Sequence, residues 1–207
     1  MTRRALAAFA LALAVADAGA TSVLVMTAGP GRAQILVDDR TLHTLRAGEQ
    51  TPEGVALVAA TYDAATFVVD GREVVVRLGE RNDGRVTLFA DRDRRFRARV
   101  HVNGASSVGL IDTGAEAVTI GRKLASELGI DYAKGRRAKL NTVVGQVPGF
   151  LVTLSSVKIG PIEVADVQGV VADSDAPEFG LVLVGASFLT RVHFEQHGNR
   201  LTLIPGK

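Results

Sequence analysis

Cysteine and tryptophan are absent from this chain of 207 residues, and aromatic residues make up only 5% of it. The lack of cysteine excludes disulfide bonds and structural zinc sites built on cysteine. An excess of one charge is also lacking, because the formal net charge is +2, and such a small charge gives no electrostatic reason to expect nucleic acid as a partner. Apolar residues reach 47% and there are 22 glycines, a composition typical of compact β structure with many turns.

Several familiar catalytic motifs are missing as well. The sequence contains no recognisable Ser-His-Asp arrangement, phosphate-binding loop or dinucleotide fingerprint, so we expect no cofactor. His193, Glu195 and His197 are spaced two apart, which on a strand would place them on one face where they could bind a metal. Exposed strand residues alternate in this way by default, and we therefore expect no metal site.

A long apolar run lies at the N-terminus. Arg3 and Arg4 precede an apolar stretch over residues 5–15, and Ala18-Gly19-Ala20 offers the small-x-small pattern of a cleavage site. We predict that residues 1–20 are a signal peptide and that the protein is periplasmic or secreted. The alternative is an inner-membrane anchor over residues 5–26 that faces the periplasm. Asp17 would then lie near mid-bilayer, where a carboxylate costs several kcal/mol.

Residues 21–80 contain apolar runs of strand length separated by glycine-containing turns. The expected strands are 22–26, 34–37, 55–59, 66–69 and 74–78. No cluster of titratable residues accompanies them, and we interpret this segment as a small β accessory module for folding or docking.

Residues 81–93 are polar and turn-prone, and a dense run of charges covers residues 91–99. We predict a linker over 81–93. Exposed polar linkers are preferred sites of proteolytic cleavage, so one hypothesis is that the chain is cut between residues 80 and 97 to release the C-terminal part.

Residues 94–207 read as a second domain rich in strands. Alternation over 96–102 predicts a strand with one wet face, Asn103-Gly104 predicts a hairpin turn, and 107–111 is the return strand. A short helix is expected over 122–128, ending at Gly129. The remaining expected elements are strands 118–120, 150–157, 162–171 and 181–184, a short helix over 185–189, and a hairpin over 141–149.

The most unusual residue of this second part is Asp112, which lies between an aliphatic run and a Thr-Gly turn. Aspartate is depleted in strands and is seldom buried unless it is paired, so this carboxylate needs either hydrogen-bond partners or a function. Gly114 has no Cβ, and its amide can therefore approach the carboxylate closely.

The run Ile111-Asp112-Thr113-Gly114-Ala115 resembles the active-site motif of retropepsin-like aspartic proteases, which include retroviral proteases and bacterial periplasmic relatives. Residues 181–189 are similar to the second signature of the family, in which two aliphatic residues precede Gly185. Residues 191–203 look like the closing hairpin of the bacterial branch. The resemblance covers roughly 94–207. It implies an all-β fold, a closed β-barrel or sandwich subunit with one or two short helices, here preceded by the small β module.

The resemblance also implies roles for individual residues. Asp112, Thr113 and Gly114 would form the catalytic turn, and the hairpin over 141–149 would be the flap that closes over a peptide or protein substrate. Substrate contacts would come from Ala115, Glu116, Asn141, Thr142, Val143, Val144, Gly145, Leu183 and Val184. Glu116 could equally be a solvated surface charge.

This route to peptide hydrolysis needs two carboxyl groups that share one proton, and the chain has a single Asp-Thr-Gly. The other candidates, Asp173-Ser174-Asp175, Asp70-Gly71 and Asp83-Gly84, lack parts of the motif. We therefore predict an aspartic endopeptidase that works as a homodimer, with one Asp112 from each chain. The alternative is a catalytically inactive binding or scaffold protein of the cell envelope.

Ala115 departs from the pepsin pattern, which has a serine whose hydroxyl bonds the catalytic carboxylate. Loss of that donor destabilises the anion, so we expect activity to extend toward mildly acidic or neutral pH.

Overall fold

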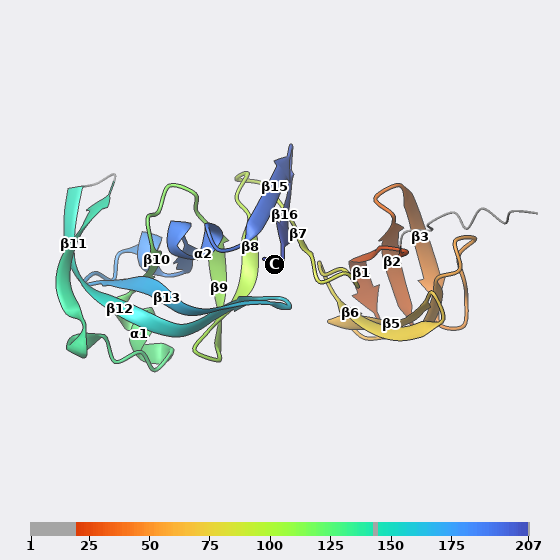
Figure 1. Cartoon of the computed structure of the whole chain (residues 1–207), viewed down its shortest axis with the longest axis horizontal. Coiled ribbons are helices and arrows are strands. Elements are labelled where there is room, and N and C mark those ends of the chain that lie inside the picture. The colour runs from red at the N-terminus through yellow and green to blue at the C-terminus, as the bar shows by residue number, and fades with distance from the viewer. Residues whose placement is uncertain (1–19, 143–144, 207) are drawn as a thin grey trace, which may run out of the picture.

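The computed structural model describes residues 20–142 and 145–206, which form two parts (Figure 1). Each part has its own hydrophobic core. The first core lies between two three-stranded antiparallel sheets. One sheet consists of β1 (Val23–Gly29), β2 (Arg32–Val37) and β3 (Thr41–Arg46), and the other of β4 (Ala56–Ala60), β5 (Ala64–Val69) and β6 (Arg72–Arg77). Strand β3 was missed in the sequence analysis because it buries only Leu45 and lacks a clear apolar pattern.

The two sheets repeat one design. Val25 pairs with Ile35 in the first sheet and Leu57 pairs with Phe67 in the second, and each pair is followed by a one-residue shift in register. The shift is a β-bulge, an extra residue that bends the strand. The middle strands β2 and β5 then end in Val37-Asp38 and Val69-Asp70, where both aspartates have a φ of 50°. The first part is thus an internal duplication that the sequence analysis did not detect.

A buried arginine connects the first part to the second. Arg81 is only 4% exposed, and its guanidinium donates to Ser22 Oγ at 2.9 Å, to Thr87 Oγ1 at 3.3 Å and to Asp39 Oδ1. Arg200 donates to the same Asp39 oxygen at 3.0 Å. Because a buried charge is costly unless it is paired, these contacts hold the β2–β3 turn against the C-terminal part of the chain.

The second core lies inside a closed barrel of six strands. The strands are β8 (Arg97–Val102), β9 (Ala105–Ile111), β10 (Val118–Gly121), β12 (Gly145–Ile159), β13 (Ile162–Ala172) and β14 (Val182–Val184). The end of β12, Val157–Ile159, pairs with β8 and closes the barrel. β11 (Arg136–Thr142) pairs with the start of β12 as an outer hairpin. The helices are α1 (Arg122–Glu127), α2 (Ala186–Leu189), and the 3-10 turns η1 (Tyr132–Lys134) and η2 (Pro177–Phe179). The predicted all-β class, with a closed barrel, two short helices and a preceding β module, is confirmed.

A third small sheet stands beside the barrel and corrects the prediction for residues 81–93. It consists of β15 (His193–His197), β16 (Arg200–Ile204) and β7 (Val86–Phe89), in that order. Thus residues 86–89 are not a linker but a strand paired with the C-terminal hairpin. The polar neighbours of this short run concealed it in the sequence. Within residues 20–142 and 145–206, no helix has the length and hydropathy needed to span a membrane.

Glu80, half-buried after β6, gives a testable pH dependence. Burial raises the pKa of its carboxyl group, and Arg77 and Lys158 partly offset this effect. Because the folded-state pKa exceeds the unfolded one, stability falls as pH rises from the ordinary carboxyl range through the folded-state pKa. Glu80→Gln should therefore melt at a higher temperature relative to the wild type at pH 7 than at pH 4. Glu73→Gln, at an exposed position of β6, is the control, and the same trend in both variants would contradict the argument.

Candidate active site

The loop after β9 holds Asp112 by backbone contacts on both sides. β14 runs parallel to β9 with Val184 opposite Ile111, and the Asp112 N–H donates to the Val184 carbonyl at 3.0 Å. The Gly114 N–H then donates to Asp112 Oδ1 at 2.9 Å, as expected from the sequence. A third bond, from the Ala115 N–H to the Asp112 carbonyl at 3.2 Å, closes the turn. The carboxylate is therefore fixed at the end of a barrel strand.

The first residues of helix α2 bind this loop through backbone hydrogen bonds. The Ala186 N–H donates to the Ala115 carbonyl at 2.8 Å, and the Ser187 N–H donates to the Glu116 carbonyl at 3.1 Å. Gly185 precedes the helix with a φ of −97°, so its conformation is open to any residue. Its lack of a side chain is still required, because a Cβ would lie 2.6 Å from the Ala115 carbonyl oxygen and 2.5 Å from that of Ala117. The second sequence signature thus packs directly under the first.

The predicted catalytic residues all lie on one loop that faces outward. Asp112 is half-buried, while Thr113, Gly114 and Glu116 are exposed. Half-buried Ala115 contributes its backbone to the turn. An exposed loop that presents a well-positioned carboxylate is a surface that a second chain can approach.

Two predicted substrate contacts, Leu183 and Val184, have different degrees of burial. Leu183 is half-buried and pairs with Thr119 of β10. Val184 is 0% exposed, so its side chain belongs to the core and not to a substrate-binding surface. The family resemblance implied a substrate contact for Val184, whereas its backbone carbonyl accepts the Asp112 N–H.

The predicted flap is the β11–β12 hairpin, and Figure 1 shows it projecting toward the same edge of the barrel as the β9–β10 loop. Asn141 and Gln146 pair on its outer part, where Gln146 Nε2 donates to Asn141 Oδ1 at 3.3 Å. Leu140 and Val147 are half-buried cross-strand neighbours on the other face. Thr142 and Gly145 are the last paired residues of the hairpin. The predicted contacts Val143 and Val144 lie outside the described residues.

Aromatic contacts anchor the base of this hairpin. The rings of Tyr132 and Phe150 lie 5.5 Å apart, and the Arg137 guanidinium lies 5.6 Å from the centre of the Phe150 ring. Gly149 approaches β13 so closely that a Cβ would lie 2.6 Å from the Val171 carbonyl oxygen. These contacts fix the base of the hairpin, and further out Asn141 and Gln146 present exposed polar side chains.

The other acidic residues considered in the sequence are held by other groups. Asp70 accepts two hydrogen bonds from Thr21, and Asp83 pairs with Arg85 at 2.8 Å. Asp173 and Asp175 both pair with Arg122, at 3.0 Å and 2.8 Å. The hydrogen bond from the Arg122 side chain holds the pKa of Asp175 below its ordinary value. None of these four is therefore a suitable second catalytic carboxyl.

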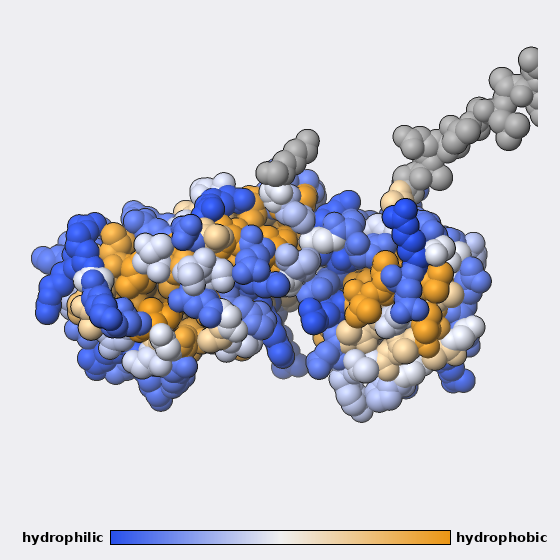
Figure 2. Space-filling model, turned by 60° about the horizontal axis from the view of Figure 1, so that its bottom comes forward, coloured by the Kyte–Doolittle hydropathy of each residue, from blue (hydrophilic) through white to orange (hydrophobic). Residues whose placement is uncertain are grey.

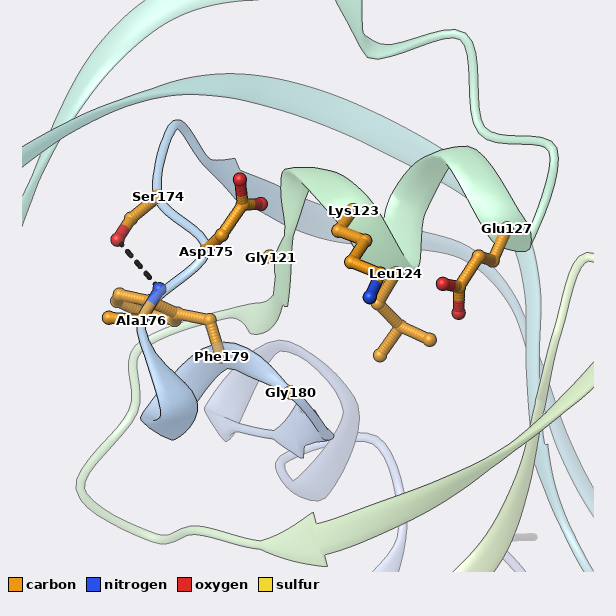
Figure 3. Close-up of a pocket in the computed structure, with 9 residues that line it drawn as sticks. All are labelled: Gly121, Lys123, Leu124, Glu127, Ser174, Asp175, Ala176, Phe179 and Gly180. Atoms are coloured by element: carbon orange, nitrogen blue, oxygen red, sulfur yellow. Dashed lines mark hydrogen bonds between the residues drawn. The ribbon is translucent and has the colours of Figure 1, made fainter.

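A small pocket lies between α1 and the segment 174–180, with a volume of about 170 Å³. Figure 3 shows Lys123, Leu124 and Glu127 on the α1 side and Asp175 and Phe179 on the other. Asp112 does not line this pocket. Its walls mix opposite charges with the apolar side chains of Leu124, Ala176 and Phe179, so it does not define a ligand by itself.

The residues considered for a metal site in the sequence, His193, Glu195 and His197, lie on β15. His193 Nε2 lies 3.6 Å from Glu195 Oε1, and both side chains are largely exposed. Throughout residues 20–142 and 145–206, no group of three or more His, Cys, Asp or Glu side chains is arranged to hold a metal ion.

Ser187 is a site residue that the sequence analysis missed. Its hydroxyl donates to the Gln168 carbonyl at 2.7 Å and accepts the Val118 N–H at 2.9 Å, so it joins α2 to β13 and to the strand that leaves the catalytic loop. A serine within the apolar run of residues 181–189 was the only signal in the sequence.

Ser187→Ala should lower the free energy of unfolding by about 1–3 kcal/mol, because the partly buried Val118 amide loses its partner. Urea unfolding would measure this change. Ser126→Ala is a matched control, since the exposed Ser126 hydroxyl bonds only the Arg122 carbonyl of its own helix. Equal losses in the two variants would show that the Ser187 bridge has no special role.

Comparisons with known proteins agree with this geometry. Residues 98–191 match the family model described as gag-polyprotein putative aspartyl protease. Among solved structures, the chain is similar to a retropepsin-like aspartic protease from Rickettsia conorii, with a TM-score of 0.51 and 29% sequence identity. That similarity covers 58% of this chain and 89% of the other. A comparison with curated proteins finds no match. The resemblance inferred from the Asp112 motif is thus confirmed.

Proposed function

Residues 98–191 carry the fold and sequence pattern of a retropepsin-like aspartic protease, and from this premise we propose that the protein is an aspartic endopeptidase that acts as a homodimer. One observation carries the proposal. The Asp112 carboxylate is fixed by the Gly114 amide at 2.9 Å on a loop whose next two residues are exposed. A turn that is rigid yet open is suited to completion by a second copy of itself.

In the proposed dimer, the two Asp112 carboxyl groups meet at the two-fold axis and share one proton, because two carboxyls about 3 Å apart cannot both ionise. The ionised group removes a proton from a water molecule, which attacks the scissile carbonyl. The protonated group donates its proton to the carbonyl oxygen. The carboxyl group that took the proton of the water then donates it to the leaving nitrogen, and the other carboxylate takes a proton back from a hydroxyl of the tetrahedral intermediate. The C–N bond breaks, one peptide gains a carboxyl terminus and the other an amino terminus, and the pair again shares one proton.

Two observations support the proposed dimer, namely the number of available carboxylates and the exposure of the catalytic loop. Asp70, Asp83, Asp173 and Asp175 are engaged by other groups, so a second chain is the simplest source of the second acid. A two-fold axis places the same surface of both chains in contact. Exposed Thr113 would then face its own copy, where its hydroxyl can bond the partner's backbone.

The flap would supply closure over the substrate. Closing hairpins exclude water from hydrolytic sites, and the β11–β12 hairpin combines a fixed base with a polar outer part. Leu140 and Val147 give its half-buried face an apolar character, which favours peptide substrates with apolar side chains near the cleaved bond.

We also propose that the protein is exported and that its signal peptide is removed. Val23–Gly29 form strand β1, whose residues Val23, Leu24 and Val25 are 0% exposed. An anchor helix over residues 5–26 would require this strand to unfold. The apolar stretch that ends before Thr21 is shorter than the about 20 residues of a membrane-spanning helix, which favours cleavage. Mass spectrometry of the mature N-terminus tests this part, and a membrane-bound chain that begins at Met1 would contradict it.

The structure limits where a second cleavage between residues 80 and 97 is expected. Arg92–Arg95 are exposed in a turn held by the Asp91 carboxylate, which accepts the N–H groups of Asp93 and Arg95, both at 2.9 Å. We propose this turn as the site of any cut. Because β7 precedes it and pairs with β16, the N-terminal part would stay attached until that strand separates.

The accessory module is proposed to dock the protease to other proteins. Figure 2 shows apolar surface on both parts of the molecule. Exposed large apolar or aromatic side chains of the module are Leu42, Val58, Tyr62, Val75 and Leu78.

Incubation of the purified protein with a peptide library tests the proposed activity. We expect cleavage that extends to mildly acidic or neutral pH and that an aspartic-protease inhibitor blocks. Failure to cleave any peptide at any pH by a protein that is dimeric and folded would instead support a scaffold role.

A further inference from the structure

The segment that follows the predicted cleavage site is held by the turns of the duplicated module. The Thr21 N–H donates to Asp70 Oδ2 at 2.9 Å, and the Thr21 hydroxyl donates to Asp70 Oδ1 at 2.8 Å. The next amide, of Ser22, donates to Asp38 Oδ1 at 2.8 Å, and the Ser22 carbonyl accepts the Asp38 N–H at 2.9 Å. Asp38 and Asp70 occupy equivalent positions in the two repeats. Their carboxylates therefore accept the N–H groups of two successive residues, Ser22 and Thr21.

The environment of Thr21 suits a cation. Asp70 contacts Thr21 through both carboxylate oxygens. Around Ser22 lie the carboxylates of Asp38 and Asp83 and the guanidinium of Arg81. The Arg81 charge is already paired with Asp39 and that of Arg85 with Asp83. In the uncleaved chain, where Ala20 is bonded to Thr21, both groups that Thr21 donates to Asp70 are neutral.

We propose that Thr21 is the mature N-terminus and that Asp70 binds its new α-ammonium group, so that removal of the signal peptide creates an ion pair that the precursor lacks. The inference rests on the proposed export. A signal-type endopeptidase adds water across the Ala20–Thr21 bond, the C–N bond breaks, Ala20 keeps a carboxylate and Thr21 becomes an ammonium. The nitrogen that donates to Asp70 at 2.9 Å then carries the positive charge, and the neutral hydrogen bond becomes charge-assisted.

This pairing gives the mature chain a specific pH dependence. An α-amino group titrates at a pKa of about 7.7–8.0 when unperturbed, and a neighbouring carboxylate raises that value. A raised folded-state pKa contributes stability that is present below the unfolded pKa and is lost as pH rises through the folded one. The extra stability should therefore be complete at pH 6 and absent at pH 10.

The test compares the chain that begins at Thr21 with one that begins at Gly19, in which the Thr21 nitrogen is an amide. Exposed ion pairs are weak, so the Thr21 chain should melt about 1–3 °C higher at pH 6, and the difference should vanish at pH 10. Asp70→Asn should abolish the difference. Asp63→Asn, at the opposite end of β5, removes the same charge and should leave the difference unchanged.

Direct titration of the Thr21 α-amino group by NMR provides the second readout. We expect its pKa to fall by a few tenths of a unit in Asp70→Asn and to be unaffected by Asp63→Asn. Equal melting temperatures for the two chains at pH 6, or a difference that survives Asp70→Asn, would overturn the ion pair. A mature N-terminus other than Thr21 in the exporting cell would overturn the cleavage position. Peptide hydrolysis does not enter these measurements, so their outcome is separate from that of the protease proposal.

Discussion

Replacing Asp112 by Asn should lower the rate of peptide hydrolysis by about 10²–10⁴-fold, the range typical of losing a general acid–base group, with little change in stability. The amide oxygen of asparagine can accept the Gly114 N–H as Asp112 Oδ1 does at 2.9 Å, so the turn should survive. The variant removes the ability to take up and release a proton. Steady-state kinetics on a cleavable peptide, with urea unfolding of the same samples, would measure both effects.

Asp131→Asn is the matched control for this substitution. Asp131 belongs to the same part of the chain, is exposed, and pairs with Lys134 at 2.7 Å. Its replacement should leave both the rate and the stability near those of the wild type. Unchanged hydrolysis by Asp112→Asn would show that the observed cleavage comes from another group.

Gly185→Ala should damage stability and activity together. The added methyl group would lie 2.5 Å from the Ala117 carbonyl oxygen and 2.6 Å from that of Ala115, both backbone atoms that cannot rotate away. Overpacking of this kind costs about 3 kcal/mol. The strand and loop that carry Asp112 must shift to relieve it, and a displacement of about 1 Å can reduce a rate by about 100-fold. Urea unfolding and kinetics on the fraction that remains folded would measure the two effects.

Gly29→Ala is the corresponding control. A Cβ at Gly29 would meet only side-chain atoms of Arg32, at 3.6 Å and 3.9 Å, which is ordinary contact. We expect it to change stability by less than about 1 kcal/mol. If Gly185→Ala behaved in the same way, the close packing of α2 under the catalytic loop would not be required for its geometry.

The sequence predicted the elements whose signal is local. Alternation over 96–102, the turn at Asn103-Gly104 and the aliphatic run into Asp112 correspond to β8, its hairpin and the end of β9. The role of Gly114 was also readable, because a glycine next to a carboxylate permits close approach of its amide.

Features that depend on distant partners were not readable. Strand β7 exists because Val86–Phe89 pair with β16, more than a hundred positions away, and its own residues lie among polar turns. The family resemblance implied that Val184 contacts substrate, but its burial is decided by β10 and β9, the strands on either side of β14. Ser187 bridges Val118 and Gln168, neither of which is near it in sequence. The repeat in the first part is evident in strand pairing. Its sequence signal, Val-Asp-x-Arg at 37–40 and 69–72 followed by Arg-x-Gly-Glu at 46–49 and 77–80, was overlooked.

The most direct test of a shared catalytic site is to mix wild-type chains with Asp112→Asn chains and let the subunits exchange. If each site needs Asp112 from both chains, random pairing of equal amounts leaves about one quarter of the dimers active, and activity falls with the square of the wild-type fraction. If each chain carries its own complete site, activity falls linearly, to about one half in the same mixture. We predict the quadratic dependence, and a linear one would contradict the account.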